Sequence, residues 1–398
     1  YATIKEELIN RGHKFVSDTD TEVLVHLIED IKNKTGVDLF EAVRIALNEV
    51  VGAYAILVID KNRPDQIICA KKSSPLVIGI GLDGEYYVGS DATPIVEYTR
   101  NVVYLEDEEV ALIDTNEDLK IVNIHNQEKT PYIHELEMQL ETLEKGGYDY
   151  FMLKEIYEQP RSIKDCYRGR MNLEQGIIRL GGIEQFEGKW INARRIIIVA
   201  CGTSWHAGLV AEYLFEEFAR IPVEVEYASE FRYRNPVIHE DDIVIAISQS
   251  GETADTLAAI GLAKDRGAHI FGVCNVVGST ISRATDSGAY THAGPEIGVA
   301  STKAFTAQVT VLTLMALSVA NMRGSISKEK FHRLVAELAT IPGKIEEVLK
   351  MNDMIKYIAD IYKNATNALY LGRGYSFPVA LEGALKLKEI SYIHAEGY

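Results

Sequence analysis

Two uninterrupted apolar runs constrain the fold of this chain more than any other feature of its sequence. Ile196–Ala200 (IIIVA) and Ile243–Ile247 (IVIAI) contain no polar side chain. Strands of this kind are buried on both faces, as in a parallel sheet that carries helices on each side. Other patterns alternate along the same stretch: helices at 204–218, 228–232, 253–266 and 301–321, and strands at 223–227 and 269–274. The alternation predicts a doubly wound, parallel α/β domain over residues 181–335.

Loops that bear hydroxyl groups follow both runs. The first is Cys201-Gly202-Thr203-Ser204, and the second is SQSGET at 248–253. Ligands of open α/β sheets bind beyond the carboxyl ends of the strands, and free N–H groups at the start of a helix favour an anion. The loops therefore predict a phosphate site built from hydroxyl and N–H groups. The alternative is that Ser204 and Thr253 are ordinary helix N-caps. Neither GxGxxG nor GxxxxGK[ST] occurs in this domain, which argues against a dinucleotide or a P-loop nucleotide.

The composition excludes several partners. There are 41 Lys and Arg residues against 58 Asp and Glu, a formal charge of −17, whereas nucleic acids and anionic membranes favour basic surfaces. The four cysteines are scattered, and no His, Asp or Glu cluster has metal-ligand spacing. The longest aliphatic stretch, 309–320, is too short to span a bilayer. We expect a soluble cytoplasmic protein without metal, cofactor, nucleic-acid or membrane partners.

The N-terminal part has a different pattern. Residues 1–135 predict a mixed α+β unit with antiparallel strands, with helices at 4–11, 21–34 and 39–50 and strands at 54–59, 66–70, 76–80, 85–89, 102–105, 110–113 and 119–124. Residues 136–180 are polar and charged. Together with His134 and Glu135 they favour a linker or a pair of docking helices.

An internal repeat relates two parts of the chain. Gly202 and Gly372, Glu212 and Glu382, and Glu226 and Glu396 are each 170 residues apart. The repeat predicts that residues 350–398 begin a second copy of the α/β domain, with one strand at 368–371 and one helix. A single strand cannot bury both faces of a parallel sheet. We therefore expect this second domain to be truncated and the chain to be a fragment.

Several segments resemble one family. CGTS at 201–204, SQSGETADT at 248–256 and EIGVASTK at 296–303 resemble the first sugar-isomerase (SIS) domain of glutamine–fructose-6-phosphate aminotransferases. ALEGALKLKEISYIHAE at 380–396 resembles the start of the second SIS domain. SDTDTEV at 17–23 resembles part of the glutaminase domain, and EIYEQP at 155–160 resembles the inter-domain segment. The resemblance implies an α+β, N-terminal nucleophile hydrolase-like glutaminase portion followed by doubly wound SIS domains, the second truncated.

The resemblance also implies roles for particular residues. The residues that hold the sugar phosphate would be Thr203, Ser204, Ser248, Gln249, Ser250 and Thr253, and those that contact the sugar would be Val299 and Ser301. Glu389 matches the general base that moves a proton between C1 and C2, and Glu382 and Lys386 match accessory residues. Asp20 matches the carboxylate that binds the α-amino group of glutamine. From spacing alone, Glu382, Lys386 and Glu389 share one helical face, which is also typical of an ion-paired surface, and Asp20 is equally a helix N-cap.

The family condenses fructose 6-phosphate with ammonia from glutamine to give glucosamine 6-phosphate and glutamate. The resemblance thus implies an enzyme without a cofactor, expected as a homodimer or higher homo-oligomer. Its N-terminal cysteine nucleophile and Schiff-base lysine match no residue here, so we expect this polypeptide alone to be inactive. The alternatives are an SIS-type phosphosugar sensor without catalysis, or another amidotransferase that acts on phosphoribosyl pyrophosphate or aspartate.

Overall fold

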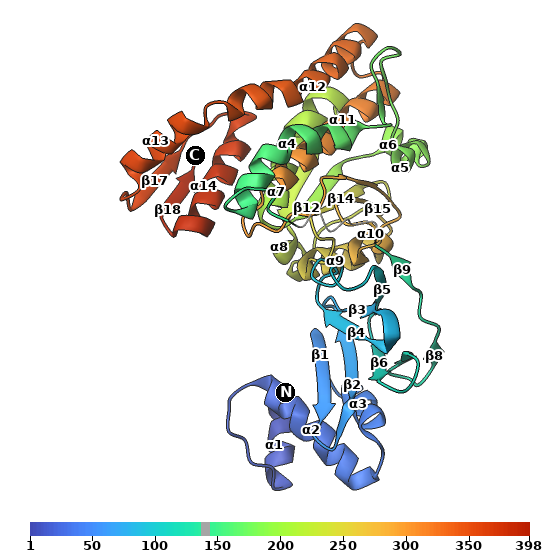
Figure 1. Cartoon of the computed structure of the whole chain (residues 1–398). Helices are drawn as coiled ribbons and strands as arrows, with labels where there is room; N and C mark the ends of the chain where they lie inside the picture. Colours follow the sequence, from blue (N-terminus) through green and yellow to red (C-terminus); the bar gives the residue numbers. More distant parts are fainter. Residues whose placement is uncertain (137–143) are drawn as a thin grey trace. The chain divides into compact units, whose positions relative to one another are not determined.

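The chain forms two compact units. Figure 1 shows the computed structural model, which describes residues 1–136 and 144–398. Contacts between residues divide the chain into unit 1, Tyr1–Leu140, and unit 2, Glu141–Tyr398.

Unit 1 is an antiparallel α+β structure, as the sequence predicts. Its helices are α1 (Ala2–Asn10), α2 (Asp20–Thr35) and α3 (Leu39–Leu47), with a short 3₁₀ turn at Leu82–Gly84. One sheet has the order β1 (Tyr54–Asp60), β2 (Arg63–Lys72), β6 (Glu109–Asp114), β7 (Lys120–Asn123) and β8 (Glu128–Lys129). The other has the order β4 (Tyr86–Gly89), β3 (Val77–Ile80), β5 (Asn101–Tyr104) and β9 (His134–Glu135). Alternating side chains of β2 explain the layers, because Ile68 and Ala70 pack in the helical core whereas Cys69 packs with residues of the second sheet.

The start of the segment expected to be a linker or a pair of docking helices forms a strand instead. His134 and Glu135 form β9, which pairs with β5, and Leu136 next to them is buried while Glu135 is exposed. This alternation suits a strand better than a helix. Residues 137–143, the rest of the expected first helix, lie outside the described residues. The second expected helix exists as α4 (Phe151–Tyr167), and a short hairpin of β10 (Met171–Asn172) and β11 (Ile177–Ile178) follows it.

Unit 2 contains the predicted parallel sheet. Its order is β13 (Val223–Tyr227), β12 (Ile196–Ala200), β14 (Ile243–Ser248), β15 (His269–Cys274) and β16 (Ser287–Tyr290), and every pairing is parallel. The helices around this sheet are α5 (Gly181–Glu184), α6 (Glu187–Asn192), α7 (Gly202–Leu214, continued by a π-helical turn at Phe215–Ala219), α8 (Ala228–Tyr233), α9 (Ala254–Lys264), α10 (Thr280–Ala284), α11 (Lys303–Arg323) and α12 (Lys328–Leu349).

Helices cover both faces of this sheet, which is why β12 and β14 contain no polar face. Ile196 and Ile198 pack in the core formed with α7, α11 and α12, whereas Ile197 and Val199 pack in the core formed with α8, α9 and α10. Helix α11 is long and apolar enough to cross a membrane by length and composition, but 67% of its most apolar window is buried inside the protein. It is therefore a core helix of unit 2.

The end of the chain repeats the β12–α7–β13 arrangement. Helix α13 (Asn352–Tyr362) precedes β17 (Asn367–Tyr370), α14 (Ser376–Ser391) and β18 (His394–Gly397). Strands β17 and β18 are parallel, and Ala368 faces Ala395 as Ile198 faces Val225, with the same offset of 170 residues. The predicted repeat thus extends to the register of the strands. The sequence predicts one strand and one helix here, but the structure has a second strand, β18. Tyr392 adopts φ +58°, which ends α14 and lets this strand form.

Candidate functional site

The strand order places both hydroxyl-bearing loops at one point of the sheet. Strand β12 lies between β13 and β14, so the chain first moves to one side of β12 and then to the other. Such a switch point opens a crevice beyond the carboxyl ends of the two strands, where open α/β sheets bind ligands. Val199 pairs with Ala246 near the ends of β12 and β14. The loops at 201–204 and 248–253 therefore begin side by side.

The first loop leads directly into α7. Cys201 occupies the N-cap position without a side-chain capping bond, and Gly202 is the first helical residue. Ser204 therefore lies inside the first turn, so its interpretation as an N-cap is wrong. The Ser204 hydroxyl is nearly buried and accepts a hydrogen bond from Gln308 Nε2 of α11 at 3.0 Å. This bond fixes the first turn of α7 against α11 and leaves its N–H groups at the switch point.

The second loop is closed by its own hydroxyl groups. Buried Ser248 accepts from the N–H of Gly251 at 2.9 Å, and its Oγ lies 3.1 Å from Thr253 Oγ1. Ser250 Oγ accepts from the N–H of Glu252 at 3.2 Å. Thr253 is the N-cap residue of α9, as the alternative interpretation has it, but without a side-chain capping bond. Gln249, Ser250, Glu252 and Thr253 are half-buried, whereas Ser248 and Gly251 are buried.

Helix α14 brings three further side chains to the first loop. Thr203 donates to Glu382 Oε1 at 2.9 Å and accepts from Lys386 Nζ at 3.0 Å. Glu382 is buried, and its second oxygen lies 2.6 Å from His206 Nδ1. Lys386 also lies 2.8 Å from Glu389 Oε2. The i, i+4, i+7 spacing thus produces one continuous ion-paired face that runs from buried Glu382 through half-buried Lys386 to exposed Glu389.

Other sequence-derived candidates lie further from these contacts. The Glu389 side chain is 36% exposed and contacts the loop only through Lys386. Val299 is 98% exposed. Ser301 donates its hydroxyl to Glu296 Oε2 at 2.8 Å. In unit 1, Asp20 is the exposed first residue of α2, and Thr19 is the N-cap that accepts from the N–H of Glu22. The N-cap interpretation of Asp20 is therefore wrong by one residue.

Two carboxylates that sequence reasoning did not assign hold the EIGVASTK segment. Glu155 of α4 accepts from the N–H groups of Ile297 at 2.6 Å and Gly298 at 3.0 Å. A Cβ at Gly298 would lie 2.5 Å from Glu155 Oε2, so a larger residue there would displace the carboxylate from these N–H groups. Glu296 accepts from the N–H groups of Thr302 and Ala304 at the start of α11. The only sequence signal for Glu155 was its place in the EIYEQP motif, because its partners lie more than 140 positions away.

Cys201 does not have the character of a nucleophile. Burial is the main cause that raises the pKa of its thiol above the ordinary value, with the nearby Asp255 carboxylate adding to it. A neutral, half-buried thiol is a poor nucleophile. Cys201 is therefore a packing residue next to the loop, in contact with the core formed with α8, α9 and α10.

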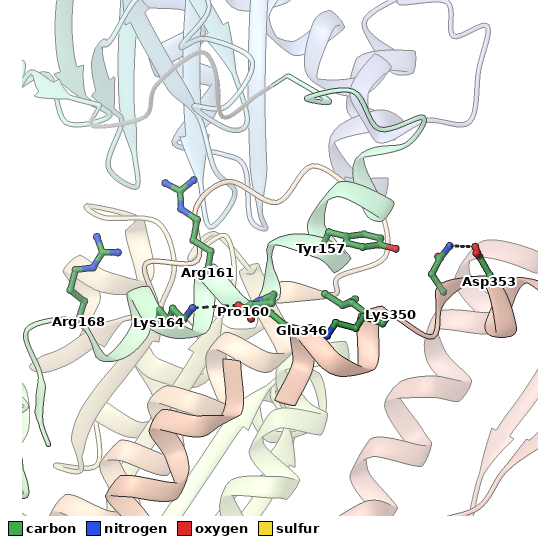
Figure 2. Close-up of a pocket in the computed structure, with 10 residues that line it drawn as sticks. Tyr157, Pro160, Arg161, Lys164, Arg168, Glu346, Lys350 and Asp353 are labelled. Atoms are coloured by element: carbon green, nitrogen blue, oxygen red, sulfur yellow. Dashed lines mark hydrogen bonds and ion pairs between the residues drawn. The ribbon is translucent and has the colours of Figure 1, made fainter. Parts of the chain in front are cut away.

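A separate cavity lies between α4, α12 and the start of α13. Figure 2 shows this cavity, whose volume is about 770 Å³. Its lining includes Arg161 and Lys164 of α4 and Arg168 just after this helix, and Lys164 lies 3.4 Å from Glu346 of α12. Basic side chains also attract anions, so this cavity is the alternative to the hydroxyl-bearing loops as a binding site for a phosphate group.

Comparisons with known proteins match two domains in this chain. A family model described as a glutamine amidotransferase domain matches residues 1–97, and one described as a SIS domain matches residues 189–318. The chain is 62% identical over 398 residues to the glutamine–fructose-6-phosphate aminotransferase [isomerizing] of Bacteroides thetaiotaomicron, which covers all of this chain and 65% of that protein. The protein of the same name from Chlorobaculum tepidum is 59% identical over 399 residues, covering all of this chain and 64% of that protein.

A solved structure supports the same relationship. The C-terminal domain of glucosamine-fructose-6-phosphate aminotransferase from Francisella tularensis is 41% identical, with a TM-score of 0.62, and the match covers 64% of this chain and 71% of that one. This chain spans slightly less than two thirds of the length of the full-length relatives named above. With both domain matches and this identity, the chain belongs to the glutamine–fructose-6-phosphate aminotransferase family.

Proposed function

We propose that this chain acts in the synthesis of glucosamine 6-phosphate and glutamate from fructose 6-phosphate and glutamine, in the cytoplasm and as a homo-oligomer. Unit 1 takes the part of the glutaminase, with an N-terminal nucleophile hydrolase-like fold, and unit 2 binds the phosphosugar. The names of the relatives that are 62% and 59% identical to this chain support the reaction. The amidotransferase match over residues 1–97 favours this enzyme over a phosphosugar sensor, which has no need of glutamine.

One observation carries the proposal for unit 2. The two hydroxyl-bearing loops begin at neighbouring strand ends, and Lys386 and Glu382 of α14 contact Thr203 in the first of them. A phosphate at the starts of α7 and α9 would accept from free N–H groups in the field of two helix N-termini. The anion is then held without a cluster of basic side chains.

The contacts suggest different roles for the loop hydroxyls. Ser250 is half-buried and uses its Oγ as an acceptor from Glu252, so its O–H remains a donor for phosphate. Gln249 and Thr253 flank it on the solvent side. Buried Ser248 and Ser204 shape the two loops, and Thr203 links the first loop to α14. Val299 and Ser301 contact the sugar in this proposal.

The proton transfer is assigned to α14. Glu389 is the general base that removes the proton from one carbon of the sugar and returns it to the neighbouring carbon. Lys386, 2.8 Å from Glu389 and 3.0 Å from Thr203, orients this carboxylate toward the phosphate loop. Glu382 fixes Lys386 and Thr203 from the buried side. In unit 1, Asp20 binds the α-amino group of glutamine.

We further infer that a polypeptide limited to these 398 residues binds the phosphosugar without completing the synthesis. The match covers 65% of the Bacteroides relative. By the family resemblance, the glutaminase nucleophile and the Schiff-base lysine match no residue of this chain.

Calorimetry with fructose 6-phosphate tests the loop assignment on this chain. Ser250→Ala removes one donor to a charged group, and we expect a loss of roughly 1–2 kcal/mol, a 5- to 30-fold weaker affinity. Ser327→Ala is the matched control, because Ser327 is the N-cap residue of α12 and belongs to neither loop. Equal affinities of the wild type and Ser250→Ala would remove Ser250 from the phosphate site.

A further inference from the structure

Two histidines and a glutamate of unit 1 converge on one point. His13 lies in the segment after α1, and His26 and Glu29 lie on α2 (Figure 1). The two Nδ1 atoms are 3.1 Å apart, and Glu29 Oε2 lies 3.9 Å from Nδ1 of His13 and 3.8 Å from Nδ1 of His26. Three donor atoms with these separations surround a position about 2 Å from each, which is the bond length of zinc to imidazole nitrogen and carboxylate oxygen.

Carboxylates on the outer side orient both imidazoles. His13 Nε2 lies 3.4 Å from Asp30 Oδ1, and His26 Nε2 lies 3.6 Å from Glu22 Oε1. Histidines that bind metals ordinarily direct their second ring nitrogen at a carboxylate, which fixes the tautomer and leaves the first nitrogen as an electron-pair donor. Both carboxylates are nearly buried themselves, with exposed fractions of 8% and 14%.

These carboxylates are held as anions. Hydrogen bonds from the Ser17 hydroxyl and the Val16 N–H lower the pKa of Glu22 to about 2. Asp30 Oδ2 accepts from Arg11 at 2.7 Å and from Lys34 at 2.9 Å, which leaves Oδ1 for His13.

Either a shared proton or a cation can join the facing Nδ1 atoms. If both Nε2 atoms carry the protons that the carboxylates favour, two lone pairs face each other at 3.1 Å, which is repulsive. A divalent ion removes this repulsion and keeps both outer contacts with the carboxylates. The imidazoles are 15% and 18% exposed whereas Glu29 is 59% exposed, so the ion has a route in from solvent and an open position for water.

We propose that His13, His26 and Glu29 form a binding site for a divalent transition metal, with zinc as the ion that best fits two imidazoles and one carboxylate. Asp30 and Glu22 are positioning residues of this site. The metal joins the segment before α2 to the helix itself, next to the loop that Glu22 holds through the N–H groups of Val16 and Ser17.

Calorimetric titration of the metal-free full chain with Zn²⁺ tests the proposal. We expect one saturable site per chain, and His13→Gln should weaken it beyond the roughly 10- to 100-fold loss expected for a positioning variant such as Asp30→Asn. His125→Gln is the matched control, since His125 is an exposed histidine of the same unit. The zinc affinity of this variant should equal that of the wild type.

Substitution by Co²⁺ gives a second measurement that needs no variant and therefore holds even if His13→Gln fails to fold. Bound cobalt should show visible absorption bands of a low-coordinate nitrogen and oxygen site, without a thiolate charge-transfer band, because no cysteine belongs to the cluster. A thiolate band would overturn the proposal, as would unchanged zinc affinity in His13→Gln. The absence of a saturable zinc site in the wild type would show instead that a shared proton alone joins the two imidazoles.

Discussion

The shape of the second hydroxyl-bearing loop depends on Gly251, and replacing it should be unusually costly. Gly251 has φ +71°, and an added Cβ would lie 2.0 Å from Ser279 Oγ and 2.4 Å from Ser279 Cβ, below any normal contact. Its carbonyl also accepts from the N–H of Ile281 in α10. The loop and α10 are thus packed backbone to backbone, and Gly251→Ala must separate them.

Gly324 provides a control that isolates the backbone conformation. It ends α11 with φ +64°, and a Cβ there would meet nothing within 4 Å. A left-handed conformation costs an alanine about 1–2 kcal/mol, which is the full expected effect of Gly324→Ala. Overpacking adds about 1–3 kcal/mol, so Gly251→Ala should lower the free energy of unfolding by about 2–5 kcal/mol.

Urea unfolding followed by tryptophan fluorescence measures this difference, because both tryptophans, Trp190 and Trp205, lie in unit 2. Gly251→Ala should also weaken fructose 6-phosphate binding under native conditions, whereas Gly324→Ala should leave it unchanged. Equal destabilisation by the two variants would refute the close packing of the loop on α10.

Two further predictions concern protonation. Burial lowers the pKa of His269 below its ordinary value, so between pH 7.5 and 5.5 the unfolded chain takes up a proton more readily than the folded chain. Unit 2 should therefore lose stability as the pH falls below about 6.5. The melting temperature of His269→Gln should depend less on pH than that of the wild type, and an equal pH dependence would contradict this. In the complete protein that contains this chain, Glu389→Gln should abolish exchange of solvent hydrogen at C1 or C2 of fructose 6-phosphate, measured by NMR in D₂O, while glutamine hydrolysis continues; retained exchange would remove Glu389 from the role of base.

The parallel sheet could be predicted from the sequence because its cause is local. Ile196–Ala200 and Ile243–Ile247 contain no polar side chain, so each had to be buried on both faces, and the structure places them as neighbouring strands. The antiparallel strands of unit 1 were predicted for the same kind of reason. The short strands β9 and β18 were missed because each depends on pairing with a distant strand more than on its own pattern.

Contacts between distant residues could not be predicted. Thr203 and Glu382 are 179 positions apart, and Ser204 and Gln308 are 104 apart, so no local pattern indicates that these hydroxyls hold other elements. The N-cap interpretation of Ser204 failed because Gly202 begins the helix two residues earlier. His13 was likewise not recognised as a neighbour of His26. A turn after α1 brings the two residues together, and their spacing in the sequence is not one of the standard metal-ligand spacings.

The central claim is that the starts of α7 and α9, at the switch point of the sheet, hold a phosphate group. A crystal structure of this chain with fructose 6-phosphate tests it most directly. We expect the phosphate oxygens within about 3 Å of Ser250 Oγ and of backbone N–H groups at the start of α9. A phosphate bound instead to Arg161 and Lys164, in the cavity between α4 and α12 (Figure 2), would contradict the account.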